Sequence, residues 1–207
     1  MTCKNMKEIT IDLLRHGDVA AGTKLLGKTN EPLSLLGWQQ LRSTVDGKAI
    51  KWNKIISSPL RRCLAFSKEI ATQYCVPLVI NSQFQEVDFG LWDGQLFADL
   101  YAGSDTEQLI QFMQDPKSIS PPEGESYHNF ELRVISAWQA LLSSLHEEEI
   151  EHCLLVTHGG VIRTIMSHVL GFPSSNLFRV EVPYASVTRI KQYEDYPPRL
   201  IFHGGSL

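Results

Sequence analysis

The chain has 207 residues, which fits one domain, and 43% of them are hydrophobic, enough for a sizeable core. Its formal net charge of −4 argues against a nucleic-acid partner, because nucleic-acid-binding domains usually carry a basic excess. No stretch approaches the roughly 18 apolar residues of a membrane-spanning helix. Residues 1–8 also lack the apolar run of a signal peptide, so neither a membrane partner nor export is expected.

The cysteines are scattered and form no C-x-x-C pair, so the sequence indicates neither a zinc cage nor a disulfide framework. A reducing, cytoplasmic location is therefore expected. Short β-branched runs alternate with helical patterns along the first part of the chain. In order, we predict a strand at 8–14, a helix at 35–45 capped by Ser34, a strand at 52–56, a helix from Pro59 to about 74, and a strand at 77–80.

The second part of the chain contains the clearest helical pattern, at 126–145, where apolar residues recur every three or four positions. Before it, residues 95–125 predict short helices broken by prolines. After it we predict a strand at 153–156, a helix at 161–170, and strands at 186–192 and 199–202. We expect residues 186–192 to offer a sheet edge through which a homodimer could form.

Strands that alternate with helices predict an α/β fold, a single domain over residues 1–207 with a mainly parallel sheet covered on both faces. Ligands of such folds bind outside the carboxyl ends of the strands. Three of the predicted strand ends carry polar chemistry. They are Arg15-His16, Ser57-Ser58 with Arg61 and Arg62 close behind, and Thr157-His158.

These residue types suit phosphate chemistry. A neutral imidazole can attack a phosphate monoester that would repel an anionic nucleophile, and the product is a phosphohistidine. Arginine stabilises the charge on the transferring group, and a carboxylic acid protonates the departing alcohol. The candidates are His16 as nucleophile, Arg15, Arg62 and His158 as phosphate-binding groups, and Glu86 as acid, with Asp88 and the weaker Asp18 as rivals.

Five blocks, in this order, resemble the histidine phosphatase or phosphoglycerate mutase-like superfamily. They are Leu14-Arg15-His16-Gly17, Ser57-Ser58-Pro59-Leu60-Arg61-Arg62, Glu86 with Gly90-Leu91-Trp92-Asp93-Gly94, Pro122-Glu123-Gly124-Glu125-Ser126, and Val156-Thr157-His158-Gly159-Gly160. The resemblance implies a three-layer α/β/α sandwich, a phosphohistidine intermediate, and no metal or other cofactor. It also places Arg62, rather than Arg61, in the pocket.

Within that superfamily, the chain is most similar to α-ribazole phosphatases of cobalamin synthesis. The similarity lies in Gly27-Lys28-Thr29-Asn30-Glu31-Pro32-Leu33-Ser34 with Gly37, and in residues 86–94. Phosphoglycerate mutases carry an arginine-rich insertion after the catalytic glutamate, whereas residues 94–121 contain no arginine. The resemblance therefore implies a small phosphomonoester as the partner, with α-ribazole 5′-phosphate preferred and a sugar phosphatase, broad-specificity phosphatase or mutase as alternatives.

Two features remain open at this stage. Many superfamily members have an asparagine shortly after the R-H-G motif that helps to hold phosphate, but residues 18–22 supply none, so the pocket is expected to rely more on backbone amides. Trp92, Phe97, Tyr101 and Phe112 either form an aromatic lid for a flat base or, as aromatics more often do, pack in the core. Outside enzymes, a phosphate-binding pseudoenzyme or regulatory module is the competing hypothesis.

Overall fold

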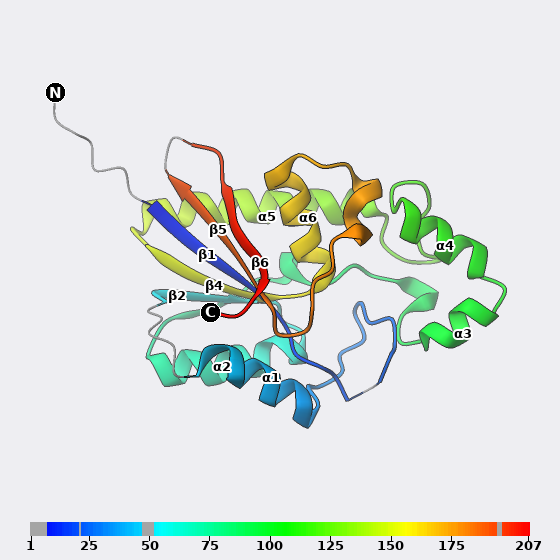
Figure 1. Ribbon diagram of the computed structural model, residues 1–207, viewed down its shortest axis with the longest axis horizontal. Coiled ribbons are helices and arrows are strands. Elements are labelled where there is room, and N and C mark those ends of the chain that lie inside the picture. Colours follow the sequence, from blue (N-terminus) through cyan, green and yellow to red (C-terminus); the bar gives the residue numbers. More distant parts are fainter. Residues whose placement is uncertain (1–7, 21, 47–51, 194–195) are drawn as a thin grey trace.

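The computed structural model describes residues 8–20, 22–46, 52–193 and 196–207. A six-stranded sheet in the order β3-β2-β4-β1-β5-β6 forms its centre. Helices α5 and α6 cover one face of the sheet, α1 and α2 cover the other, and α3 and α4 stand beyond its end (Figure 1). This arrangement confirms the predicted three-layer α/β fold.

The observed elements follow the predicted order. The strands are β1 (Glu8–Arg15), β2 (Lys54–Ser57), β3 (Leu78–Ile80), β4 (His152–Thr157), β5 (Val187–Tyr193) and β6 (Arg199–Gly205). The helices are α1 (Leu35–Val45), α2 (Arg61–Tyr74), α3 (Phe97–Ala102), α4 (Thr106–Gln114), α5 (Tyr127–Glu147) and α6 (Gly159–Leu170), with short 3₁₀ turns at Ser82–Phe84, Gly90–Trp92 and Ser174–Arg179.

Helix ends agree with the sequence where a cap is encoded locally. The Ser34 hydroxyl accepts a hydrogen bond from the Gly37 amide at 2.9 Å, as expected of an N-cap. Two predicted starts were wrong by a short distance. Helix α2 begins only at Arg61, so Pro59 precedes it, and α6 begins at Gly159 because His158, with extended backbone, is its N-cap.

The register of the sheet brings the site together. β1 runs parallel to β4 with Arg15 opposite Thr157, so the residues that follow both strands emerge side by side. β5 pairs antiparallel with β1 on one side and with β6 on the other. The prediction of a free edge at 186–192 was therefore wrong, because β6 covers that edge and β3 and β6 are the outer strands.

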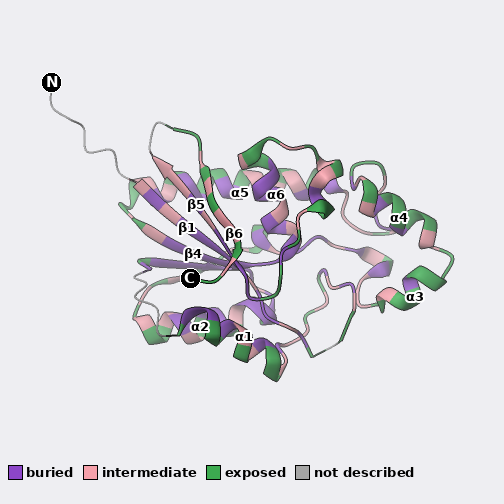
Figure 2. Ribbon diagram, in the orientation of Figure 1, coloured by how far each residue is buried: buried purple, intermediate pink, exposed green. Residues whose placement is uncertain are grey.

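Each face of the sheet has its own core, and successive β4 residues alternate between them. Leu155 packs in the cluster beneath α5 and α6, which includes Phe130 and Trp138. Leu154 packs in the cluster beneath α1 and α2. Figure 2 shows the strands buried between the helices, whose outer surfaces are exposed. None of the described helices is both long and apolar enough to span a membrane.

One buried carboxylate links the central strands. Asp12 of β1 is completely buried and accepts hydrogen bonds from Arg189 Nε at 2.7 Å and from the Trp52 indole at 3.0 Å. It also lies 2.7 Å from His152 Nε2. Burial alone would raise the pKa of Asp12, but the hydrogen bonds from His152 and Arg189 outweigh burial and lower it below its ordinary 3.8. The carboxylate thus ties β4 and β5 to β1.

Replacing Asp12 with alanine should lower the free energy of unfolding by about 3 kcal/mol, because it leaves buried donors without an acceptor. Urea denaturation at neutral pH measures the change. The matched control is Glu69→Ala, which removes the acid of an exposed Arg42–Glu69 pair and should cost under about 1 kcal/mol. Since the pKa of Asp12 is lowered by folding, its stabilisation is present above pH 3.8 and is lost as the pH falls further. Equal losses in the two variants would contradict this role for Asp12.

Candidate active site

Two imidazoles meet at the carboxyl ends of β1 and β4. His16 follows β1, His158 follows β4, and their ring centroids are 5.2 Å apart in an edge-to-face arrangement. Both side chains are buried. The structure therefore brings together the two histidines on which the sequence prediction depends.

His16 is held as one tautomer. Its Nδ1 lies 2.8 Å from the carbonyl oxygen of Gly17, and because a carbonyl only accepts, Nδ1 carries the proton. Nε2 therefore keeps its lone pair. Burial, followed by the nearby charges of Arg62 and Arg15, lowers the pKa of His16 well below its ordinary 6.5. A neutral ring with a free Nε2 is the form that can act as a nucleophile.

His158 has the opposite tautomer. Its Nδ1 accepts from Arg62 Nε at 3.2 Å, which leaves the proton on Nε2, and that nitrogen donates to the Ser58 hydroxyl at 2.8 Å. Burial and then the charge of Arg62 also lower the pKa of His158. Both ring nitrogens thus have protein partners, and phosphate contact by His158 stays a prediction.

Arg62 is fully buried, and backbone carbonyls of a loop, not a carboxylate, accept its hydrogen bonds. Its Nη1 donates to the Thr29 carbonyl and its Nη2 to the Gly27 carbonyl, both at 2.7 Å. With the bond to His158, these contacts use three of the five N–H groups of the guanidinium. Phosphate contact by Arg62 therefore stays a prediction. Arg61, by contrast, is exposed, as the sequence predicted.

Asp93 holds that loop from the other side. Its carboxylate accepts from the backbone amides of Gly27 at 3.0 Å, Lys28 at 2.6 Å and Thr29 at 3.1 Å. A Cβ at Gly27 would lie 2.2 Å from the Val87 carbonyl oxygen, so only glycine permits this close approach. The loop that supplies the two carbonyl acceptors of Arg62 therefore packs closely against the segment that contains Glu86.

Arg15 has an unused donor. Its guanidinium carbon lies 4.0 Å from the centre of the Tyr184 ring, and one Nη donates to the Val182 carbonyl. Its Nε is buried and has no hydrogen-bond partner within the part of the chain that the structure describes. Because buried donors are normally satisfied, this N–H is suited to an anionic ligand.

Glu86, the predicted acid, lines the same cleft as His16. Its carboxylate accepts from the Val87 amide at 3.1 Å and from the Gly160 amide, in the first turn of α6, at 2.9 Å. A Cβ at Gly160 would lie 2.2 Å from Glu86 Oε1, so this approach also requires glycine. Glu86, His16 and Arg15 line one cleft of about 250 Å³.

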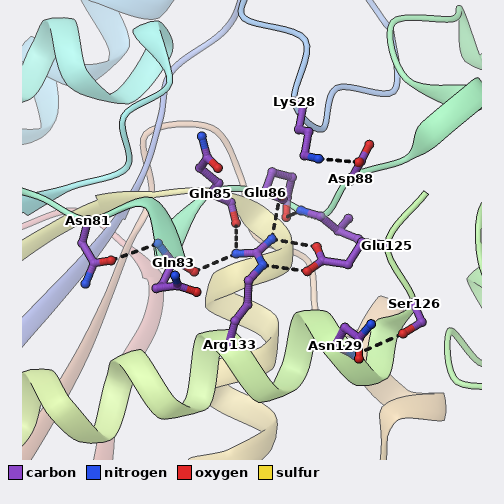
Figure 3. Close-up of polar contacts among 11 residues, drawn as sticks. Lys28, Asn81, Gln83, Gln85, Glu86, Asp88, Glu125, Ser126, Asn129 and Arg133 are labelled. Carbon is purple, nitrogen blue, oxygen red and sulfur yellow. Dashed lines mark hydrogen bonds and ion pairs between the residues drawn. The ribbon is translucent and has the colours of Figure 1, made fainter. Parts of the chain in front are cut away.

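The rival acids have other partners. Asp88 receives a hydrogen bond from Lys28 at 2.6 Å (Figure 3) and another from the Gly90 amide at 3.0 Å. Burial would raise the pKa of Asp88, but these bonds outweigh it and lower the pKa, which keeps the group ionised. Asp18 accepts from the Ser34 hydroxyl. Neither lines the cleft, so the geometry favours Glu86.

A family model for the histidine phosphatase superfamily (branch 1) matches residues 11–201. The chain belongs to the histidine phosphatase superfamily. Among curated proteins it is 28% identical over 187 residues to the bifunctional protein Rv2228c of Mycobacterium tuberculosis, covering 88% of this chain and 50% of that protein. It thus spans about half the length of the first curated relatives it matches.

Solved structures share the fold. The alpha-ribazole phosphatase of Shigella flexneri matches with a TM-score of 0.80 at 22% identity, covering 95% of this chain and 96% of that one. The mycobacterial glucosyl-3-phosphoglycerate phosphatase Rv2419c matches with a TM-score of 0.81 at 23% identity, covering 97% and 100%. Such identities show a common fold, and membership of the superfamily supports phosphatase activity in general.

Much of the remaining wall of the cleft is apolar, although Lys24, Arg163 and Thr164 also line it. Phe97 and Phe112, two of the four aromatics considered as a lid, line it. Trp92 is completely buried, and Tyr101 is half exposed and stacks on Phe97 with centroids 6.5 Å apart. Phe112 and Trp92 are both buried in the core, as the packing alternative predicts, and a lid formed by Phe97 stays a prediction.

The sequence reasoning missed two residues that line the cleft. Arg163 donates from Nε to the Val180 carbonyl at 2.8 Å and lies close enough to Glu86 and Arg15 for their charges to act on it. Its spacing of four from Gly159 places it on the same face of α6, a signal the sequence did contain. Tyr184, whose ring is 5.5 Å from that of His16, had no such signal.

Within residues 8–20, 22–46, 52–193 and 196–207, no three His, Cys, Asp or Glu side chains gather closely enough to hold a metal ion. Lys24, Arg15 and Arg163 are the positively charged side chains that line the cleft. Arg62 does not line it, but its charge acts on His16 and it donates to His158. With the single carboxylate of Glu86, the cluster keeps a net positive charge, which suits a phosphate dianion.

The ring signals of His16 and His158 should not titrate as the pH falls through 6.5, because burial and the arginine charges disfavour protonation. Nitrogen-detected NMR of ¹⁵N-histidine protein measures this, with assignments from His16→Gln and His158→Gln. A histidine-containing model peptide in the same buffer provides the reference titration. A midpoint near 6.5 for His16 would show that the ring is not held neutral.

Proposed function

We propose that this protein hydrolyses a small phosphomonoester through a phosphohistidine on His16. The observation that carries the proposal is the free Nε2 of a neutral His16 in a cleft shared with Arg15, Arg163 and Glu86. A binding module or pseudoenzyme has no need of a nucleophile and an acid in one cleft, so the complete set favours catalysis.

In the first half of the reaction, His16 Nε2 attacks phosphorus in line. The N–P bond forms as the bond from phosphorus to the alcohol oxygen breaks, and protonated Glu86 gives its proton to that oxygen. Arg15, Arg62 and Arg163 stabilise the charge on the remaining phosphate oxygens. The alcohol leaves, and Glu86 is left as a carboxylate.

In the second half, water attacks the phosphohistidine. The Glu86 carboxylate takes a proton from the water as its oxygen bonds to phosphorus and the N–P bond breaks. Inorganic phosphate leaves, while His16 recovers its neutral form and Glu86 its proton. The cycle needs no metal or other cofactor, in line with what the family resemblance implies.

We further propose α-ribazole 5′-phosphate as the substrate, which would place the protein in cobalamin synthesis. The apolar wall that includes Phe97, Phe112 and Phe178 suits the flat base of that ester. The motifs at residues 27–37 and 86–94 support the same branch.

One feature favours a second candidate, a phosphatase or mutase for acidic sugar or glycerate esters. Lys24 lines the cleft and has no ion-pair partner among the residues that the structure describes. Its ammonium could bind a carboxylate on the substrate. Against a mutase, α3 and α4, which follow the catalytic segment, contain no arginine.

His16→Ala should reduce phosphate release by at least about 10³-fold, because the covalent step has no other nucleophile. The substrates are α-ribazole 5′-phosphate, 3-phosphoglycerate, fructose 2,6-bisphosphate and p-nitrophenyl phosphate, each assayed with a chelator. A kcat/KM for the ribazole ester about 10²-fold above the others, equivalent to about 2.7 kcal/mol, supports the assignment.

Near-wild-type activity in His16→Ala would overturn the phosphohistidine mechanism. Equal, slow rates on all four esters would withdraw only the substrate. A preference for 3-phosphoglycerate that disappears in Lys24→Ala would favour the second candidate, and stimulation by a bisphosphorylated primer would favour a mutase.

Phe97→Ala should lower kcat/KM for the ribazole ester about tenfold and leave that for glycerol 3-phosphate within about twofold, because only the larger alcohol reaches the apolar wall. Steady-state kinetics with both esters measures the difference. Tyr101→Ala is the matched control, since Tyr101 stacks on Phe97 without lining the cleft. Equal losses on both esters would show that Phe97 acts only through folding.

A further inference from the structure

Arg133 of α5 donates hydrogen bonds to the backbone at and just before Glu86 (Figure 3). Its Nη1 donates to the carbonyl oxygens of Gln83 at 2.7 Å and Gln85 at 2.9 Å, and its Nη2 donates to that of Glu86 at 3.0 Å. Gln83 lies in the 3₁₀ turn at Ser82–Phe84, whereas Gln85 and Glu86 follow it in a segment without regular secondary structure. The guanidinium thus supplies the hydrogen bonds that regular structure would otherwise provide.

Glu125 accepts the remaining hydrogen bonds of Arg133. Its carboxylate accepts from Arg133 Nε and Nη2, both at 2.8 Å, in a bidentate pair. Together with the three carbonyls, this pair uses all five N–H groups of the guanidinium. The Glu125 amide in turn donates to the Asp88 carbonyl at 2.8 Å, so the pair is fixed to the chain on the far side of Glu86.

We propose that Arg133 and Glu125 are positioning residues for the general acid, an inference that rests on the proposed function. They hold the backbone of Glu86 so that its carboxyl group stays between the amides of Val87 and Gly160 and faces the leaving oxygen. Lysine cannot replace Arg133, because a single ammonium cannot reach three carbonyls and a carboxylate in fixed directions.

Misplacing an acid affects poor leaving groups most, because they need the proton in the transition state. Arg133→Lys should therefore lower kcat/KM about 10²-fold for glycerol 3-phosphate, whose alcohol is a poor leaving group. The loss for p-nitrophenyl phosphate should be below about threefold. kcat/KM is the appropriate constant because it reports the phosphorylation of His16 and not the later hydrolysis.

Glu125→Gln, which keeps the shape of the side chain, should shift the same ratio in the same direction by a smaller factor. The matched control is Arg42→Lys, which disrupts a bidentate pair with Glu69 on the exposed surface and should leave the ratio unchanged. Equal losses on both substrates in Arg133→Lys would overturn the proposal, since a fold defect reduces all substrates alike.

Hydrogen exchange gives a readout independent of turnover. If Arg133 positions Glu86, the Val87 and Gly160 amides should exchange at least about tenfold faster in Arg133→Lys, while core amides of β4 stay protected. Unchanged exchange at those two amides would overturn the proposal. If the wild-type protein hydrolyses none of the esters, the proposed function is refuted. Hydrogen exchange at the Val87 and Gly160 amides would then still show whether Arg133 positions Glu86.

Discussion

Two parallel strands, β1 and β4, meet in a register that sets Arg15 opposite Thr157. Every other feature of the site depends on this pairing, because it places His16 and His158 in contact without any direct bond between them. The buried Asp12 reinforces the pairing by linking β4, β1 and β5 within the same sheet. The carboxyl ends of parallel strands lie at the same edge of the sheet, so the backbone already preorganises a site that is built from the residues after them.

Burial affects the histidines and the arginines of the site differently. Burial disfavours protonated imidazole and so keeps both histidines neutral. Arginine stays charged, because its ordinary pKa lies so far above neutrality that burial, which lowers the pKa of Arg15, does not remove the charge. The site therefore combines neutral imidazoles with fixed cations. Backbone carbonyls offset part of that positive charge, as those of Gly27 and Thr29 do for Arg62. A phosphate group would supply the missing negative charge.

Irregular segments carry much of the chemistry, and each is held by a side chain from elsewhere. Asp93 binds the loop at 27–29 through its amides, and Arg133 binds the segment at 83–86 through its carbonyls. The two anchors are complementary, since a carboxylate takes the donors of one segment and a guanidinium takes the acceptors of the other. Their effect is to give loops the rigidity that a catalytic site requires.

The sequence by itself determined the order and type of the main elements, since periodicity and caps such as Ser34 act over a few residues. Its motifs also singled out His16, Glu86 and Arg15, which the structure places on one cleft. Only the tertiary structure decided which strand is an edge, because β6 covers β5. It alone revealed the contacts of Tyr184 and Arg133, whose partners Arg15 and Glu86 are far away along the chain. Local patterns encode elements and motifs, whereas contacts across the fold depend on how those elements pack.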